Sequence, residues 1–204
     1  MFFNENYKLL IQHVQKTGGE SLYYSLGKHS PVGSRWLMKY GSHVTYSMLK
    51  NQNEQLFNEV KENWFKMSTV RNPWSHAVSR YFHFIDTKRI MKTRKTHSIE
   101  MYDNFEFYLE HDYDPQDVMT FNDDNFMVDK WLRLEERDKD WDYLCEINGF
   151  GNVELVHHNK TNDRKNYFNY VKPDNYRDMY TNDRSIELVF EKSKKTIENL
   201  GYNF

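Results

Sequence analysis

Residues 8–22 read KLLIQHVQKTGGESL and contain the clearest fold signal in the chain. The first seven residues are a short, mostly apolar run, which is typical of a buried strand. Two glycines follow closely, and the next segment, SLYYSLG, places two leucines on one face of a helix. This stretch therefore predicts a strand, a tight loop and a helix in direct succession.

The same order recurs further along the chain. Trp64 to Val70 (WFKMSTV) is rich in residues that favour strands, and Arg71-Asn72 leads to Pro73, a favoured first residue of a helix. The segment PWSHAVSRYFHF then spaces its large apolar residues as a helix does. Two strand–loop–helix units predict an α/β fold with a central parallel sheet flanked by helices. The loops at the carboxyl ends of such strands form the binding crevice.

The remaining elements are less regular in pattern. Residues 128–134 and 153–156 are expected to form strands, and residues 158–172 a polar loop. We expect Asp138 to cap a helix that runs to Ile147 and is stopped by Gly149. Residues 183–200 predict one long amphipathic helix closed by Gly201.

Composition places limits on the class of protein. A chain of 204 residues fits one domain, residues 1–204, and 17% aromatic residues argue against a disordered chain. A net charge of −2 disfavours a protein that binds nucleic acid by bulk electrostatics. One cysteine, Cys145, cannot form an internal disulfide, which favours a reducing compartment. No apolar run is long enough to cross a bilayer and no signal-peptide pattern opens the chain, so a cytoplasmic, membrane-free protein is expected.

Charge is unevenly distributed in the middle of the chain. Residues 86–97 are basic, whereas residues 96–129 contain no Lys or Arg and ten Asp and Glu. Either stretch is a solvated surface, or one of them lines the cleft that takes an acceptor.

The loop between the first strand and helix has the composition of an anion site. In Lys16-Thr17-Gly18-Gly19-Glu20-Ser21, the glycines allow backbone N–H groups to approach a ligand, and the helix N-terminus adds partial positive charge. The order G-x-x-x-x-G-K-[ST] is absent, so this is not a Walker A loop. Alone, such a sequence fits an ordinary tight turn equally well.

A second segment strengthens the phosphate hypothesis. Arg71 directly follows the expected strand at 64–70, and Ser79 lies eight residues later in the next helix. An arginine there can hold a phosphate through two parallel hydrogen bonds, and the serine can add one donor.

Several segments, in matching order over most of the chain, resemble carbohydrate sulfotransferases that use 3′-phosphoadenosine 5′-phosphosulfate (PAPS). HVQKTGGESL resembles their 5′-phosphosulfate loop, and VRNPWSHAVSRYFHF is similar to their 3′-phosphate motif. GSHVTY at 41–46 resembles the Gly-His-x-x-[YF] element of the heparan and chondroitin branch. Weaker similarities cover NFEFYL at 104–109, LVHHNKT at 155–161 and residues 176–204.

The resemblance implies a three-layer P-loop-like fold and a PAPS-dependent sulfotransferase of the soluble bacterial or phage type. PAPS would be the donor, its product would be 3′,5′-bisphosphoadenosine (PAP), and the acceptor would be a hydroxyl, most simply of a saccharide. The implied cofactor-binding residues are Lys16, Thr17, Gly18, Gly19, Glu20, Ser21, Leu22, Arg71, Ser79, Asn159, Lys160 and Arg164. Two positions depart from the family pattern: Gln15 replaces a proline, and Glu20 replaces a threonine.

Two residues are expected to act in catalysis. Lys16 is expected to stabilise the leaving phosphate, and His43 to act as general base, because an imidazole accepts a proton near neutral pH. If His43 points elsewhere, the next candidates are Glu54, Glu20 and Glu106.

Other readings remain open. The pair His157-His158 predicts no metal site, because adjacent strand residues point in opposite directions and no ligand cluster completes it. Trp36, Tyr40 and Tyr46 either stack on a sugar or belong to the core. A small-molecule kinase with a variant phosphate loop and a non-catalytic module that binds PAP or a glycan are the alternative functions. The acidic stretch favours a neutral or lightly charged acceptor, and the oligomeric state is not predicted.

Overall fold

The computed structural model describes residues 1–30, 36–91, 104–121, 128–156 and 172–204. They belong to two compact units. The first contains Met1–Arg71 and Met119–Asp163, and the second contains Asn72–Val118 and Arg164–Phe204. The single domain expected over residues 1–204 stays a prediction.

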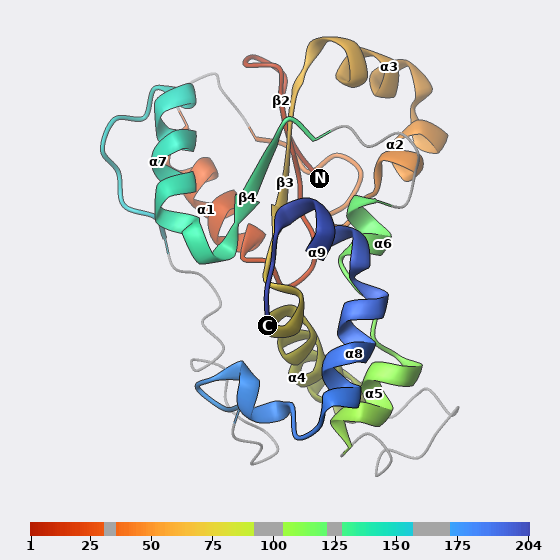
Figure 1. Ribbon diagram of the computed structural model, residues 1–204. Helices are drawn as coiled ribbons and strands as arrows, with labels where there is room; N and C mark the ends of the chain where they lie inside the picture. Colours follow the sequence, from red (N-terminus) through yellow and green to blue (C-terminus); the bar gives the residue numbers. More distant parts are fainter. Residues whose placement is uncertain (31–35, 92–103, 122–127, 157–171) are drawn as a thin grey trace. The chain divides into compact units, whose positions relative to one another are not determined.

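The first unit is built on a four-stranded open sheet with the order β1-β2-β3-β4 (Figure 1). The strands are β1 (Phe2–Asn4), β2 (Leu9–Gln12), β3 (Phe65–Val70) and β4 (Lys130–Arg133). β2 pairs with β3 in parallel, β3 pairs with β4 in parallel, and β1 runs antiparallel to β2 at the edge. The parallel arrangement of the strands at 8–14 and 64–70 is therefore confirmed, and the α/β class with it.

Helices cover both faces of this sheet because alternate strand residues point to opposite sides. On one face, Leu9 and Ile11 pack with apolar residues of α1 (Gly19–His29) and α7 (Arg137–Asn148). On the other face, Leu10 packs with residues of α2 (Tyr46–Gln52) and α3 (Glu54–Asn63). β2 is thus buried on both sides, which explains its nearly continuous apolar sequence.

Four elements of this unit were not foreseen from the sequence. β1 has only three residues, and α2 and α3 are separated only by Asn53. Their starts carry local caps, since the side chain of Thr45 accepts a hydrogen bond from Met48 N and that of Asn53 accepts one from Leu56 N. The short 3₁₀ helix η2 (Leu134–Glu136) connects β4 to α7.

The structure corrects two expectations in the region of α7. The N-cap of this helix is Glu136, so the prediction that Asp138 caps it is wrong. The expected end of the helix at Gly149 is confirmed, and Gly149 has the left-handed conformation with φ 66°. The strand expected at 153–156 is absent. Its backbone bonds to side chains instead: Trp141 Nε1 donates to the Val153 carbonyl at 2.7 Å, and Val156 N donates to Ser25 Oγ at 2.8 Å.

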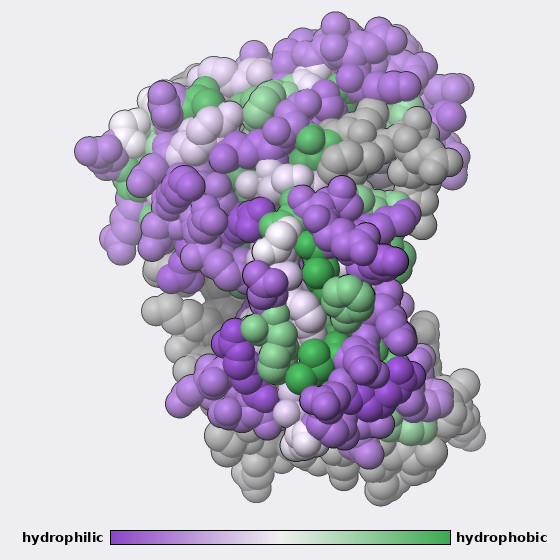
Figure 2. Space-filling model, in the orientation of Figure 1, coloured by the Kyte–Doolittle hydropathy of each residue, from purple (hydrophilic) through white to green (hydrophobic). Residues whose placement is uncertain are grey.

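The second unit is helical. It contains α4 (Pro73–Met91), α5 (Phe105–His111), the 3₁₀ helix η4 (Tyr176–Met179), α8 (Asp183–Lys192) and α9 (Lys194–Leu200), and α6 (Asp117–Thr120) spans the boundary between the units. Asn72 caps α4, since its Oδ1 accepts hydrogen bonds from Trp74 N and Ser75 N at 3.1 Å. Figure 2 shows that hydrophilic residues make up most of the visible surface.

The single helix expected at 183–200 is two helices. Ser193 separates α8 from α9 with non-helical angles of φ −111° and ψ 23°. The carboxylate of Asp117 accepts hydrogen bonds from the backbone N–H groups of Lys195, at 2.9 Å, and Thr196, at 3.3 Å. A residue distant in sequence therefore caps the second helix. No helix of the described residues has the length and apolar character needed to span a membrane.

Candidate functional site

The loop between β2 and α1 combines left-handed residues with the N-terminus of a helix. Lys16 and Gly18 both lie in the left-handed region, with φ values of 63° and 80°. Gly18 is the N-cap of α1 and brings no side chain to the first turn of this helix. Left-handed residues beside right-handed ones turn successive N–H groups toward one concavity, and a helix N-terminus adds partial positive charge.

Gly18 and Gly19 are required for different reasons. A Cβ at Gly18, besides its positive φ, would lie 2.5 Å from Cδ1 of Leu134. A Cβ at Gly19 would lie 2.2 Å from Cδ2 of His13. The loop is therefore packed closely against neighbouring side chains, and larger residues would displace it.

The hydroxyl of Thr17 faces inward. It lies 2.7 Å from the Val14 carbonyl and 2.6 Å from the hydroxyl of Thr69 on β3, and the side chain is buried. Val14 N also donates to the Thr69 hydroxyl, at 3.1 Å. Thr17 therefore anchors the loop to the sheet, and its hydroxyl is engaged with protein groups.

Arg71 approaches the same loop from the adjacent strand. It follows β3 directly, and its Nη1 donates a hydrogen bond to the Lys16 carbonyl at 3.3 Å. Burial lowers the pKa of the Arg71 guanidinium, and the negative charge of Glu135 opposes that shift. An arginine remains protonated in spite of such a shift, so a permanent cation lies beside the loop.

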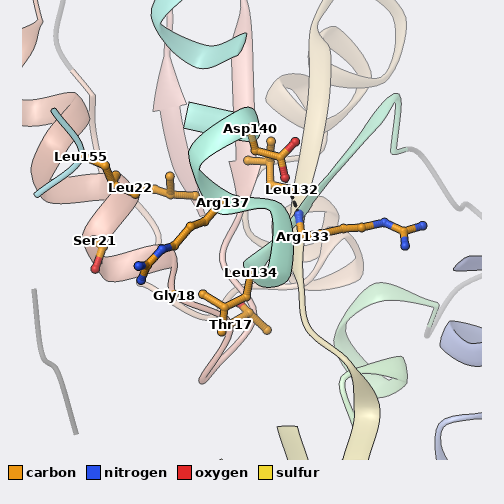
Figure 3. Close-up of a pocket in the computed structure, with 10 residues that line it drawn as sticks. All are labelled: Thr17, Gly18, Ser21, Leu22, Leu132, Arg133, Leu134, Arg137, Asp140 and Leu155. Atoms are coloured by element: carbon orange, nitrogen blue, oxygen red, sulfur yellow. Dashed lines mark hydrogen bonds between the residues drawn. The ribbon is translucent and has the colours of Figure 1, made fainter. Parts of the chain in front are cut away.

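A small pocket opens beside the loop, with a free volume of about 30 Å³. Such a volume holds one or two water molecules, so a larger ligand would lie across the mouth. Figure 3 shows the residues that line it: Thr17, Gly18, Ser21, Leu22, Leu132, Arg133, Leu134, Arg137, Asp140 and Leu155. Leu22 is also part of the buried core, which limits it to an apolar contact.

Arg137 is a site residue that sequence reasoning missed. It is the first residue of α7, and its side chain extends toward Ser21 and Gly18 (Figure 3). The carboxylate of Asp140, on the same helix, accepts a hydrogen bond from Arg133 N at 2.6 Å and holds the start of α7 against the end of β4. Burial raises the pKa of Asp140. No sequence pattern points to Arg137, because only the pairing of β3 with β4 brings it to the loop.

His43 contacts the end of β2, just before the loop begins. Its Nδ1 is 3.2 Å from the carbonyl oxygen of His13, the residue that follows β2, and the two imidazole centroids are 4.7 Å apart. His43 is half-buried. The structure thus brings together, in one unit, the loop at 16–21, Arg71 and His43.

The other candidate residues have different positions. Ser79 is buried on α4 in the second unit, and its convergence with Arg71 stays a prediction. Asn159, Lys160, Arg164 and the pair His157-His158 lie outside the described residues. Glu20 is exposed in the first turn of α1, Glu54 is exposed at the start of α3, and Glu106 lies on α5 in the second unit.

The aromatic candidates for sugar stacking are mainly core residues. Trp36 and Tyr46 are 4% exposed and belong to the two cores that flank the sheet. Tyr40 is half-buried, and its hydroxyl accepts a hydrogen bond from Asn53 Nδ2 at 3.0 Å. Their packing role therefore accounts for these residues.

Chemically, the arrangement can bind an anionic group at the loop and take up a proton at a nearby imidazole. Within the described ranges, no cluster of three His, Cys, Asp or Glu side chains could hold a metal ion.

Comparisons of the chain with protein-family models, with curated proteins and with solved structures find no match.

Proposed function

We propose that this protein is a sulfotransferase that moves the sulfuryl group of PAPS to a hydroxyl acceptor, on a three-layer P-loop-like scaffold. The observation that supports this most is the loop between β2 and α1. Its residues Lys16 and Gly18 are left-handed, it ends at a helix N-terminus without a capping side chain, and Arg71 of the neighbouring strand binds its backbone.

The residues of this loop fit a phosphosulfate group. Backbone N–H groups at the start of α1, the Ser21 hydroxyl and the Lys16 ammonium supply donors for a group with several acceptor oxygens. Arg71 supplies a fixed cation at the edge of the loop. Thr17 contributes by holding the loop in place, because its hydroxyl is engaged with β3.

Each catalytic role follows from the chemistry of the residue. PAPS would supply the sulfuryl group and leave as PAP. His43 accepts the proton of the acceptor hydroxyl at Nε2, since its Nδ1 is directed at the His13 carbonyl. Lys16 offsets the negative charge that develops on the leaving phosphate oxygen. A nearby cation stabilises this developing charge most.

The proposed acceptor is a saccharide hydroxyl, and a neutral or lightly charged saccharide is preferred. The ten carboxylates between residues 96 and 129, with no Lys or Arg among them, would repel a heavily sulfated polymer if they faced it. No metal, nucleic acid or membrane is part of this proposal, and a cytoplasmic location accompanies it.

Transfer of ³⁵S-labelled sulfate from PAPS to a panel of neutral and acidic oligosaccharides tests the proposal directly. Calorimetric titration with PAP and with ATP is run beside it. Transfer together with tighter binding of PAP than of ATP supports the sulfotransferase. Binding of PAP without transfer to any member of the panel would favour a non-catalytic binding module, and tighter binding of ATP would favour a kinase.

The non-catalytic module is supported by one residue. Glu20 is exposed in the first turn of α1, close to where an anion would bind. A carboxylate there either repels the ligand or interacts favourably with the positive end of the helix dipole. Comparing the affinity of wild type and Glu20→Gln for PAP separates these effects, because only repulsion predicts tighter binding by the variant.

A further inference from the structure

His13 lies between two parts of the candidate site. It follows β2, and its imidazole is only 4% exposed. A Cβ at Gly19 would meet Cδ2 of this ring at 2.2 Å and Nε2 at 2.7 Å. The ring therefore occupies the space next to the first residue of α1, and it determines how closely the start of that helix approaches β2.

The same residue contacts His43 through its backbone. The carbonyl oxygen of His13 is 3.2 Å from His43 Nδ1, with the rings 4.7 Å apart between centroids. A carbonyl oxygen only accepts hydrogen bonds, so Nδ1 of His43 must carry the hydrogen. A neutral imidazole has one N–H, and its lone pair is then on Nε2.

The ring of His13 is itself unsuited to proton transfer. Burial and the positive charge of protonated His43 lower the pKa of His13 to about 3, so the ring is neutral near pH 7. Its Nδ1 has no hydrogen-bond partner among the residues that the structure describes. The side chain also contacts Phe2, with ring centroids 5.2 Å apart, and this packing helps to keep it in place.

We propose that His13 is a positioning residue. Its ring sets the start of α1 against β2, and its carbonyl holds His43 in the Nδ1–H tautomer. In this tautomer, Nε2 of His43 accepts the proton of the acceptor hydroxyl. Only the last step rests on the proposed function. The tautomer and the packing are properties of the free protein, and they can be measured without a substrate.

Nuclear magnetic resonance of ¹⁵N-labelled imidazoles tests the tautomer. The signals of His43 are identified by their absence in His43→Asn. Above the pKa of His43, the wild type should show a protonated Nδ1 and an unprotonated Nε2. His13→Ala, which removes the ring that orients this backbone, should shift part of the population to the Nε2–H form. A protonated Nε2 in the wild type would overturn the proposal, and so would an unchanged tautomer population in a folded His13→Ala.

A double substitution tests the packing. Gly19→Ala should lower the Tm of the wild type by about 2–10 °C, because its Cβ clashes with the His13 ring. In the His13→Ala background the same substitution should cost clearly less, since the ring is absent. Equal losses in the two backgrounds would show that His13 does not brace the helix start.

Turnover separates positioning from general structural support. His13→Ala should lower turnover about 10-fold or more, as expected when a general base is misplaced. In the His43→Ala background, His13→Ala should lower turnover by a clearly smaller factor, because the part that acts through His43 is already lost and only the effect on the start of α1 remains. An equal further loss would contradict the proposal. If the wild type transfers no sulfate, the proposed function fails, while the tautomer and the Tm cycle still decide the role of His13.

Discussion

The hydroxyls of Thr17 and Thr69 lie 2.6 Å apart, although 52 residues separate them in the chain. This contact fastens the loop before α1 to the neighbouring parallel strand, and Val14 N donates to the same Thr69 hydroxyl. The loop between β2 and α1 is thus fastened to the end of β3, which explains how Arg71 can bind the Lys16 carbonyl.

Replacing Thr69 with Val tests this link. The substitution keeps the shape but leaves the Thr17 hydroxyl and Val14 N–H without this partner, so the free energy of unfolding should fall by about 1–3 kcal/mol. Urea unfolding measures the loss. The control is Thr181→Val, at an exposed position of the second unit, which should change stability by less than about 0.5 kcal/mol. Equal stability of the two variants would argue against a structural role for the contact.

Arg71→Lys keeps the positive charge but removes the planar fork of donors. The affinity for PAP should fall about 5- to 150-fold, which corresponds to about 1–3 kcal/mol for a charged hydrogen bond. Isothermal calorimetry gives the affinity, and Arg184→Lys, on the exposed face of α8, serves as the control. Wild-type affinity in Arg71→Lys would remove Arg71 from the binding site.

Arg137→Gln tests the cation that extends toward Ser21. If this side chain meets an anionic group of the ligand, the affinity for PAP should fall about 3- to 30-fold at low salt and less at high salt, because Arg137 is half exposed. Lys139→Gln, two residues further along α7, removes an exposed charge that does not line the pocket. The same modest loss in both variants would indicate only a general effect of net charge.

His43→Ala and Lys16→Ala should differ in their effect on binding. Both should lower turnover about 10²- to 10⁴-fold, the usual contribution of acid–base groups. His43→Ala should leave the affinity for PAPS nearly unchanged, whereas Lys16→Ala should weaken it. The rise of wild-type rate with pH through the titration of an imidazole should be missing in His43→Ala. Turnover above about a third of the wild-type rate in His43→Ala would place the base elsewhere.

Stability should depend on pH through His13. Its pKa is about 3 in the folded protein, whereas an imidazole that is not buried has a pKa of 6.5, so the unfolded chain binds one more proton between these values. Unfolding free energy should therefore fall as pH is lowered from about 6.5, by at most about 1.4 kcal/mol per pH unit for one proton. Urea titrations from pH 7 to 4.5 measure this slope, which should be smaller in His13→Asn. The carboxyls of the half-buried Asp117 and the buried Asp140 have pKa values raised by desolvation and act in the opposite sense, but they are present in both proteins. Identical slopes would show that His13 titrates normally.

The sequence alone was sufficient for the elements whose signals are local. The apolar run before Lys16, the strand formers before Arg71, and the proline at position 73 predicted β2, β3 and the start of α4. Gly149 and Gly201 likewise ended their helices as expected, in the left-handed conformation. Periodicity, turn residues and caps depend on neighbours within a few positions, and they can be read without a tertiary structure.

Other features depended on contacts between distant residues. Asp117 caps α9 and divides the expected helix at Ser193, and the side chains of Trp141 and Ser25 take the backbone bonds that a strand at 153–156 would have used. In the candidate site, no local signal in the sequence predicts three features. These are the inward turn of the Thr17 hydroxyl, the approach of Arg137 to the loop and the contact of His13 with His43. The sequence indicated which residue types could bind an anion. Only the pairing of parallel strands and the packing of helices on them decided which of these side chains meet and which atoms remain for a ligand.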